Sequence, residues 1–243
     1  MKRFPLEFSE LLTPAGRRIL ARGAAGPRGA LADPERPFVA IDRAIDRQVA
    51  TDMRRLLDRH LYPLLTTLVS PIAPESITGQ TRDHQERLRK TVRVKTAYLQ
   101  RRNSRAFRAA EDLGLMAMLR SASFHAFVEA LAGRRLDPIC GQQLLCYGAG
   151  DYAGPHTDHL PENPRARGGY VDVHLTFSHP DVAHHYLVHA RGGHFSEIVD
   201  VNTAGGITAY RLPFWHYTTP LQAKPGREKT ARRWVVLGSF YFA

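Results

Sequence analysis

Residues 146–159 have the sequence CYGAGDYAGPHTDH, and residues 213–221, PFWHYTTPL, carry a further histidine, His216. In an extended strand, side chains two positions apart point to the same side, so His156 and Asp158 can direct an imidazole nitrogen and a carboxylate oxygen to one point. A second imidazole from a neighbouring strand would complete a set of two histidines and one carboxylate on one face of a metal ion. This set leaves the opposite face of the ion open and suits non-haem Fe(II).

The length and composition of the chain predict one domain with a sizeable core. The chain has 243 residues, of which 43% are hydrophobic. No apolar run reaches the roughly 18 residues of a membrane span, and the N-terminus has no hydrophobic segment typical of a signal peptide. Two cysteines, Cys140 and Cys146, form neither a disulfide framework nor a zinc pattern. We therefore expect a cytoplasmic protein.

The net charge of +11 is concentrated in the first 150 residues, where 25 lysines and arginines face 15 acidic residues. Ten of these basic residues lie between Arg82 and Arg108. Such a run can bind nucleic acid or an acidic substrate. It can equally be a solvated basic face, which we favour because no aromatic residues are interleaved for base stacking.

The first 140 residues predict two segments. Prolines and glycines punctuate residues 1–40, which we expect to be an irregular N-terminal segment. Residues 41–140 predict a helical elaboration with the first strand or strands of the sheet. Apolar spacing in residues 41–69 favours a long helix that stops near Pro63 or soon after. Alternation favours a strand over 91–99, and residues 104–132 predict one or two helices. Ser123 is the candidate N-cap of the second of these helices and Gly133 its stop.

The pattern of apolar and turn-forming residues changes at residue 141. Short apolar or alternating runs such as QQLLCYG, GYVDVHLTFS, GITAYRL and RWVVLGSFYFA are separated by turn residues. Many short strands without long intervening helices predict an antiparallel sandwich or barrel. We expect residues 141–243 to form this core and to carry the metal site, in a protein of the α+β class.

In this order of motifs the chain resembles the Fe(II)- and 2-oxoglutarate-dependent dioxygenases, especially their prolyl-hydroxylase-like branch. FVEALAG precedes YGAGDY, and His156-Thr157-Asp158 follows. Gly192-Gly193, GGITAYR, His216 with Pro220, and the terminal RRWVVLGSFYF come next. The resemblance covers roughly residues 104–243. It implies a double-stranded β-helix, a jelly-roll or cupin-like barrel, with the N-terminal helices packed on it.

The resemblance also implies the roles of individual residues. His156, Asp158 and His216 would be the iron ligands, and Tyr147 would assist in binding the cosubstrate. An arginine that opens the last strand would hold the distal carboxylate of 2-oxoglutarate, because its planar fork can donate two parallel hydrogen bonds. We favour Arg233, which shares a strand face with Val235, Leu237 and Ser239. Arg232 and Arg227 are the other two candidates.

With the triad complete, we expect no further iron ligand among the other histidines of the core: His174, His179, His184, His185, His189 and His194. The implied reaction uses Fe(II), 2-oxoglutarate and O₂, with ascorbate as a reductant, and releases succinate and CO₂. It would hydroxylate an unactivated C–H bond of a small molecule, either amino-acid-like or a natural product, or of a peptidyl substrate. Two alternatives stay open: a cupin-like metal enzyme that does not use 2-oxoglutarate, and a basic module directed to nucleic acid. The sequence carries no signal for oligomeric state.

Overall fold

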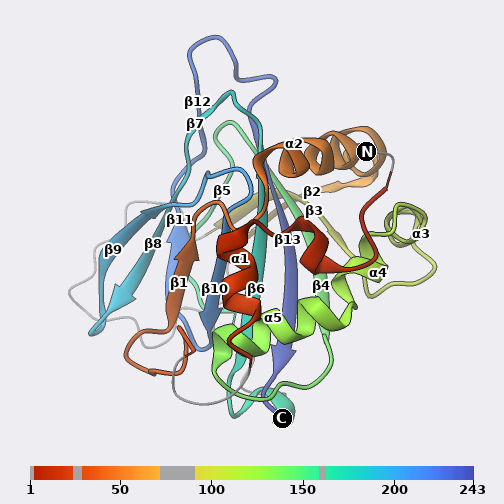
Figure 1. The fold of residues 1–243 in the computed structure, drawn as a ribbon. Coiled ribbons are helices and arrows are strands. Elements are labelled where there is room, and N and C mark those ends of the chain that lie inside the picture. Colours follow the sequence, from red (N-terminus) through yellow and green to blue (C-terminus); the bar gives the residue numbers. More distant parts are fainter. Residues whose placement is uncertain (1–2, 24–28, 72–90, 159–162) are drawn as a thin grey trace.

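A curled antiparallel sheet with helices on its outer face forms the molecule (Figure 1). The computed structural model describes residues 3–23, 29–71, 91–158 and 163–243. The strand order of the main sheet is β1-β10-β6-β13-β4-β3-β2, with β5 paired to β3. Its strands are β1 (Phe38–Ile41), β2 (Thr66–Pro71), β3 (Thr91–Tyr98), β4 (Gly141–Gly148), β5 (Tyr152–Ala153), β6 (Tyr170–Ser178), β10 (Ile207–Arg211) and β13 (Arg232–Tyr241).

Smaller sheets close the open side of the main sheet. One has the order β11-β8-β9 and the other pairs β12 with β7. Their bounds are β7 (Val182–His184), β8 (Tyr186–Arg191), β9 (His194–Asp200), β11 (His216–Thr218) and β12 (Gln222–Ala223). A curled sheet faced in this way by a minor sheet is a double-stranded β-helix, which confirms the predicted fold class.

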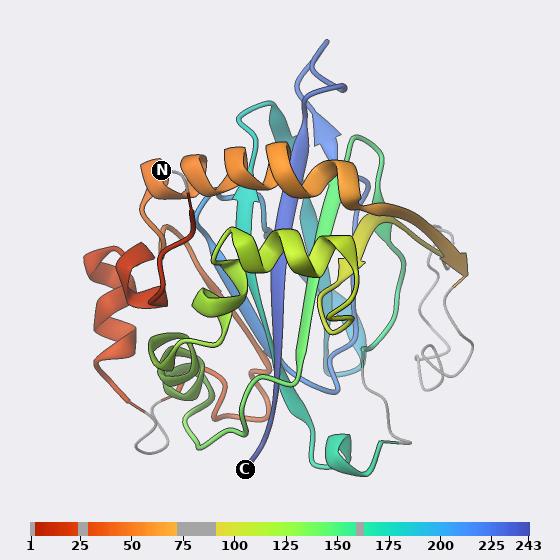
Figure 2. The same ribbon diagram turned by 90° about the vertical axis from the view of Figure 1, so that its right-hand side faces the viewer.

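The helices cover the outer face of the main sheet, and α2 crosses the long strands β4 and β13 (Figure 2). Phe124 and Phe127 of one helix pack against Phe8, and Phe240 of β13 contacts Phe124. No helix within the described residues combines the length and the apolar character needed to cross a membrane. The helical segments are η1 (Phe8–Leu11), α1 (Pro14–Leu20), α2 (Arg47–Leu56), the π-helical turn η2 (Leu57–Leu61), η3 (Tyr62–Leu64), α3 (Arg105–Asp112), α4 (Leu115–Leu119), α5 (Ala122–Ala132) and η5 (Pro164–Ala166).

Several predicted elements of the first half of the chain were wrong in extent. Residues 1–40 include the helix α1, which Thr13 caps by accepting from the Gly16 N–H, and most of β1. The helix expected over 41–69 begins only at Arg47, because the Asp46 carboxylate accepts from two N–H groups there. That region instead starts with the end of β1, where Ile41 pairs with Ile207 of β10, and finishes with the start of β2.

The region 104–132 forms three helices rather than one or two. Gly114 adopts a left-handed backbone with φ of 81° and separates α3 from α4. Ser121, not Ser123, caps α5, since its hydroxyl accepts from the Phe124 N–H. The Ser123 hydroxyl donates to Glu7 instead. The helix stop at Gly133 is confirmed, with φ of 69°.

The strand predicted over 91–99 is confirmed as β3, and it lies in the main sheet beside β4. Together with β1 and β2, it brings strands from the first 140 residues into the sheet that carries the site. The basic residues from 82 to 90 lie outside the described residues.

Candidate metal centre

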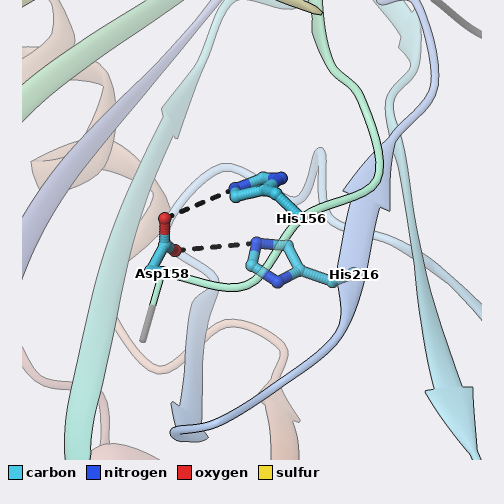
Figure 3. A group of neighbouring side chains, drawn as sticks. All are labelled: His156, Asp158 and His216. Carbon is cyan, nitrogen blue, oxygen red and sulfur yellow. Dashed lines mark ion pairs between the residues drawn. The ribbon is translucent and has the colours of Figure 1, made fainter. Parts of the chain in front are cut away.

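The three predicted metal ligands meet at one point inside the barrel (Figure 3). His156 forms an isolated bridge with His216 of β11, in which each backbone N–H donates to the other residue's carbonyl at 3.0 Å. Asp158 follows two residues later. His156 Nε2 lies 3.4 Å from Asp158 Oδ1, and His216 Nε2 lies 3.8 Å from Asp158 Oδ2. The three potential ligand atoms all lie within 4.8 Å of one another.

Backbone carbonyls fix the tautomers of both histidines. His156 Nδ1 lies 2.6 Å from the Gly154 carbonyl oxygen, and His216 Nδ1 lies 3.0 Å from that of Phe214. A carbonyl only accepts, so each Nδ1 carries a hydrogen and each Nε2 keeps its lone pair in the neutral ring. Two nitrogen lone pairs and a carboxylate then converge, an arrangement that needs a cation. The residues present therefore fit a metal ion of the Fe(II) type.

Burial and the charges of the neighbouring groups set the protonation of each member of the triad. Burial, followed by the neighbouring His156, lowers the pKa of His216 to about 4. Burial opposes the ionisation of Asp158, but the two ligand histidines outweigh it and lower the pKa of this carboxyl. Burial also opposes the charged form of His156 and lowers its pKa. The Asp158 carboxylate has a larger opposite effect, so the pKa of His156 is raised. In the metal-free protein, a proton on His156 therefore competes with a metal ion.

Arg233 is a buried cation in the same cavity as the triad. The cavity has a volume of about 190 Å³. The guanidinium is 3% exposed, and its Nη2 donates to Thr176 Oγ1 at 3.1 Å. Nη1 lies 3.3 Å from His185 Nδ1, and Nε has no partner. Within the described residues no carboxylate lies within 4.0 Å of the guanidinium, and the charge of Asp200 acts on it only from a longer distance.

Burial lowers the pKa of Arg233 to about 10, which still leaves it charged at neutral pH. A buried charge without a counter-ion is costly, and an anionic ligand would remove that cost. Tyr147 pairs with Arg233 across β4 and β13 and lines the same cavity. Burial raises the pKa of this tyrosine to about 12, so its hydroxyl stays protonated and can donate.

The other two candidate arginines lie away from the cavity. Arg232 points to the opposite face of β13, where it stacks on Tyr62 at 4.2 Å and lies 3.7 Å from Asp58. Arg227 is exposed in the connection between β12 and β13. The alternation of side chains along a strand separates Arg232 from Arg233, as the sequence predicted.

Tyr210 and His174 are polar neighbours of the triad that the sequence did not single out. The Tyr210 hydroxyl lies 3.3 Å from Asp158 Oδ2 and 3.1 Å from His174 Nε2. Asp158 is ionised, so Tyr210 donates to it and His174 Nε2–H donates to Tyr210. Within the described residues His174 and His185 are not in the metal cluster. The alternation in YVDVHLTFS could have placed His174 and Thr176 on one face, but nothing local marks Tyr210.

Comparisons with known proteins agree with this architecture. No family model and no curated protein sequence matches the chain. Among solved structures, a 2OG-Fe(II) oxygenase family oxidoreductase from Burkholderia pseudomallei matches with a TM-score of 0.61 and 12% identity, over 93% of this chain and 90% of that one. The α-ketoglutarate-dependent carbocyclase SnoK of nogalamycin biosynthesis gives 0.55 and 12%, over 97% and 86%.

The α-ketoglutarate-dependent epimerase SnoN, from the same biosynthesis, matches with a TM-score of 0.54 and 16% identity, over 94% of this chain and 83% of that one. α-Ketoglutarate is 2-oxoglutarate. The chain thus has the double-stranded β-helix fold of the 2-oxoglutarate- and Fe(II)-dependent oxygenases, and the resemblance seen in the order of motifs is confirmed at the level of the fold.

Proposed function

We propose that the protein is an Fe(II)- and 2-oxoglutarate-dependent oxygenase that oxidises an unactivated C–H bond. The observation that carries this proposal is Arg233, a buried cation that forms no ion pair within 4.0 Å among the described residues and lies in the cavity that holds His156, Asp158 and His216. A metal triad alone would suit many metal enzymes. A carboxylate-binding cation in the same cavity favours a 2-oxoacid cosubstrate with a second carboxylate.

His156 and His216 would hold Fe(II) through Nε2, and Asp158 would hold it through a carboxylate oxygen. When bound, the ion would bind 2-oxoglutarate and O₂ and supply the oxidising chemistry. The protein holds the three ligands on one side of the ion and leaves the other side to the cavity. The hydrogen bonds of both Nδ1 atoms to backbone carbonyls keep the two rings oriented for this role.

Arg233 would receive the distal carboxylate of 2-oxoglutarate, with the Thr176 hydroxyl as its neighbour. Tyr147, which stays protonated, would add a hydroxyl donor. The position of Arg233 also argues against the alternative of a metal enzyme without 2-oxoglutarate, because such an enzyme has no use for an uncompensated buried cation beside the metal. Arg232 and Arg227 would not take part.

Hydroxylation is the outcome we favour, since Asp158 fills the carboxylate position of the triad. In halogenases related to this fold that carboxylate is missing and chloride takes its place. Two neighbours of this chain are named as a carbocyclase and an epimerase, so the fold also supports other oxidations. SnoN was solved in complex with Fe³⁺, α-ketoglutarate and nogalamycin RO, which makes a small-molecule substrate a reasonable expectation here.

Adjacent arginines provide a matched test of the cosubstrate site. Loss of a buried cation that pairs with a ligand carboxylate costs about 2–5 kcal/mol. The affinity of the Fe(II)-loaded protein for 2-oxoglutarate, measured by anaerobic calorimetry, should therefore fall roughly 30-fold or more in Arg233→Met. In Arg232→Met, which removes the same group from the opposite face, it should stay within about threefold. Equal affinities in the two variants, or no binding by the wild type, would reject the proposed cosubstrate.

A further inference from the structure

The main sheet presents a continuous wall beside the metal triad. Across β6, β13, β4 and β3, the residues His174, Leu237, Gln143 and Tyr98 lie in register and form one row. Val235 and Leu145 form part of the next row, between Thr176 and Thr96. These rows are on the face of β13 that carries Arg233, so the wall begins at the candidate cosubstrate site and runs outward.

The centre of this wall is apolar. We call it the apolar shelf and define it as Leu68, Val92, Leu145, Val235 and Leu237, which come from four adjacent strands and all line the cavity. Val235 is buried and the other four are half-buried. Half-buried apolar side chains in the cavity of the candidate metal site can bind an apolar ligand, because a ligand that covers them removes apolar area from water.

Gln143 and His174, two polar groups of the same wall, each offer a neutral acceptor. Thr96 Oγ1 donates to the Leu144 carbonyl at 2.9 Å, so it must accept from Gln143 Nε2, which lies 2.9 Å away. This fixes the amide of Gln143 and leaves its carbonyl oxygen as an acceptor. His174 donates through Nε2 to Tyr210, so the lone pair of its Nδ1 remains as an acceptor. Burial lowers the pKa of His174 to about 3, in keeping with a neutral ring.

Fixed charges of the sheet are directed away from the wall. Among the described residues, the only fully charged side chains that line the cavity are Asp158 and Arg233. The basic residues of β3 alternate with its apolar ones and face outward. Arg93 pairs with Asp151 at 2.9 Å, and Lys95 donates to Thr67 at 3.3 Å and lies over the Tyr62 ring. Their charge is therefore not available to a ligand on the shelf.

We propose that the substrate is a neutral, predominantly apolar small molecule with a hydroxyl or N–H donor, bound on the apolar shelf with its donor toward Gln143 and His174. The inference deepens the proposed oxygenase function and rests on it. It replaces the expectation of an acidic substrate that the basic composition raised. Among the described residues, the one cation that lines the cavity is Arg233, which we assign to the cosubstrate, so an anionic group on the shelf would lose its hydration without gaining a cation there.

Two dyes of one skeleton test the charge preference, in protein saturated with Zn²⁺ and 2-oxoglutarate so that Arg233 is occupied, and at about 0.3 M salt to screen the net positive charge. Neutral N-phenyl-1-naphthylamine should bind wild type, with enhanced fluorescence, roughly tenfold more tightly than the anionic 8-anilino-1-naphthalenesulfonate. Leu68→Glu should lower the affinity for the neutral dye by about tenfold. Val69→Glu is the matched control, since Val69 is 67% exposed and lies on the other face of β2, and it should change affinity by less than about twofold.

A second pair of probes tests the donor preference. 2-Naphthol should bind about three- to tenfold more tightly than 2-methoxynaphthalene, and Gln143→Leu should abolish this difference while the methoxy compound still binds. Tighter binding of the sulfonate dye, or equal effects of Leu68→Glu and Val69→Glu, would overturn the proposal. Titration of wild type with 2-oxoglutarate is independent of the dyes, so it separates failure of the shelf from failure of the oxygenase assignment.

Discussion

At the scale of single residues, Tyr210 is placed to constrain how Asp158 would bind the proposed metal ion. Its hydroxyl donates to Asp158 Oδ2, while Oδ1 faces His156. A hydrogen bond on one carboxylate oxygen favours coordination through the other, and single-oxygen coordination leaves more of the ion to other ligands. Tyr210 also packs its ring against His216 at 5.1 Å, so it touches two of the three ligands.

Tyr210→Phe keeps the ring and removes only the hydroxyl. Groups of this kind contribute about 10–100-fold to metal affinity, so we expect a loss within that range in titrations with Co²⁺ or Mn²⁺. Tyr62→Phe is the control, because Tyr62 lies on the outer face beneath Lys95 and Arg232. Unchanged metal affinity in Tyr210→Phe would show that Asp158 is positioned without this hydrogen bond.

Asp172 is a second buried carboxyl group near the triad. It is 3% exposed, its Oδ1 has no partner, and burial followed by the charge of Asp158 raises its pKa to about 8. Its pKa in the unfolded chain is about 3.9, so between pH 4 and 8 the folded state holds the proton more tightly. The stabilisation from this proton is complete below the unfolded pKa and is lost as the pH rises through about 8.

Asp172→Asn should remove this pH dependence. The group contributes a fall of at most about 1.4 kcal/mol per pH unit to the free energy of unfolding. Urea denaturation of metal-free protein from pH 5 to 8 should thus show that the free energy of unfolding of Asp172→Asn increases relative to that of wild type as the pH rises. Asp42→Asn, at an exposed position, should show the same pH dependence of the free energy of unfolding as wild type. A constant difference between Asp172→Asn and wild type would mean that Asp172 is ionised in the folded protein.

At the scale of elements, Asp58 of η2 links the helices on the outer face to β13 of the main sheet. Its Oδ1 accepts from Trp234 Nε1 at 2.9 Å, and its Oδ2 pairs with Arg54 at 2.6 Å. Trp234 is fully buried on the outer face of β13, and Arg54 is 8% exposed. Loss of this carboxylate leaves a buried indole N–H and a buried guanidinium without an acceptor.

We therefore expect Asp58→Ala to lower the free energy of unfolding by about 2–3 kcal/mol, measured by urea denaturation. Asp52→Ala, on the same helical segment, removes a carboxylate that pairs with the largely exposed Arg55 and should cost less than about 1 kcal/mol. Similar losses in the two variants would show that Asp58 does not anchor the helix to β13.

Element types were more predictable than their limits. The strand at β3 and the stop at Gly133 follow from local pattern and backbone conformation. The limits of α2 do not, because Ile41 has the spacing of a helical residue and pairs with β10 only through a tertiary contact. Ser121 and Ser123 are equally suitable caps in sequence, and the choice depends on Glu7, which lies far away in the chain.

At the scale of the whole molecule, the barrel brings the site together from distant segments. His156 and His216 were predictable because each lies in a motif with recognisable neighbours, and strand alternation separated Arg233 from Arg232. Tyr210 and His185 lie near the site only through the pairing of strands, so their sequence contexts did not mark them.

We propose that the triad and Arg233 together bind Fe(II) and 2-oxoglutarate. Anaerobic titration of the Fe(II)-loaded protein with 2-oxoglutarate tests it most directly, through the weak visible charge-transfer band of a chelated 2-oxoacid. We predict that the band forms in wild type, is lost in His156→Ala and Asp158→Ala, and needs far more 2-oxoglutarate in Arg233→Met. Iron binding without a band in wild type would contradict the account and would make this barrel a metal site of another kind.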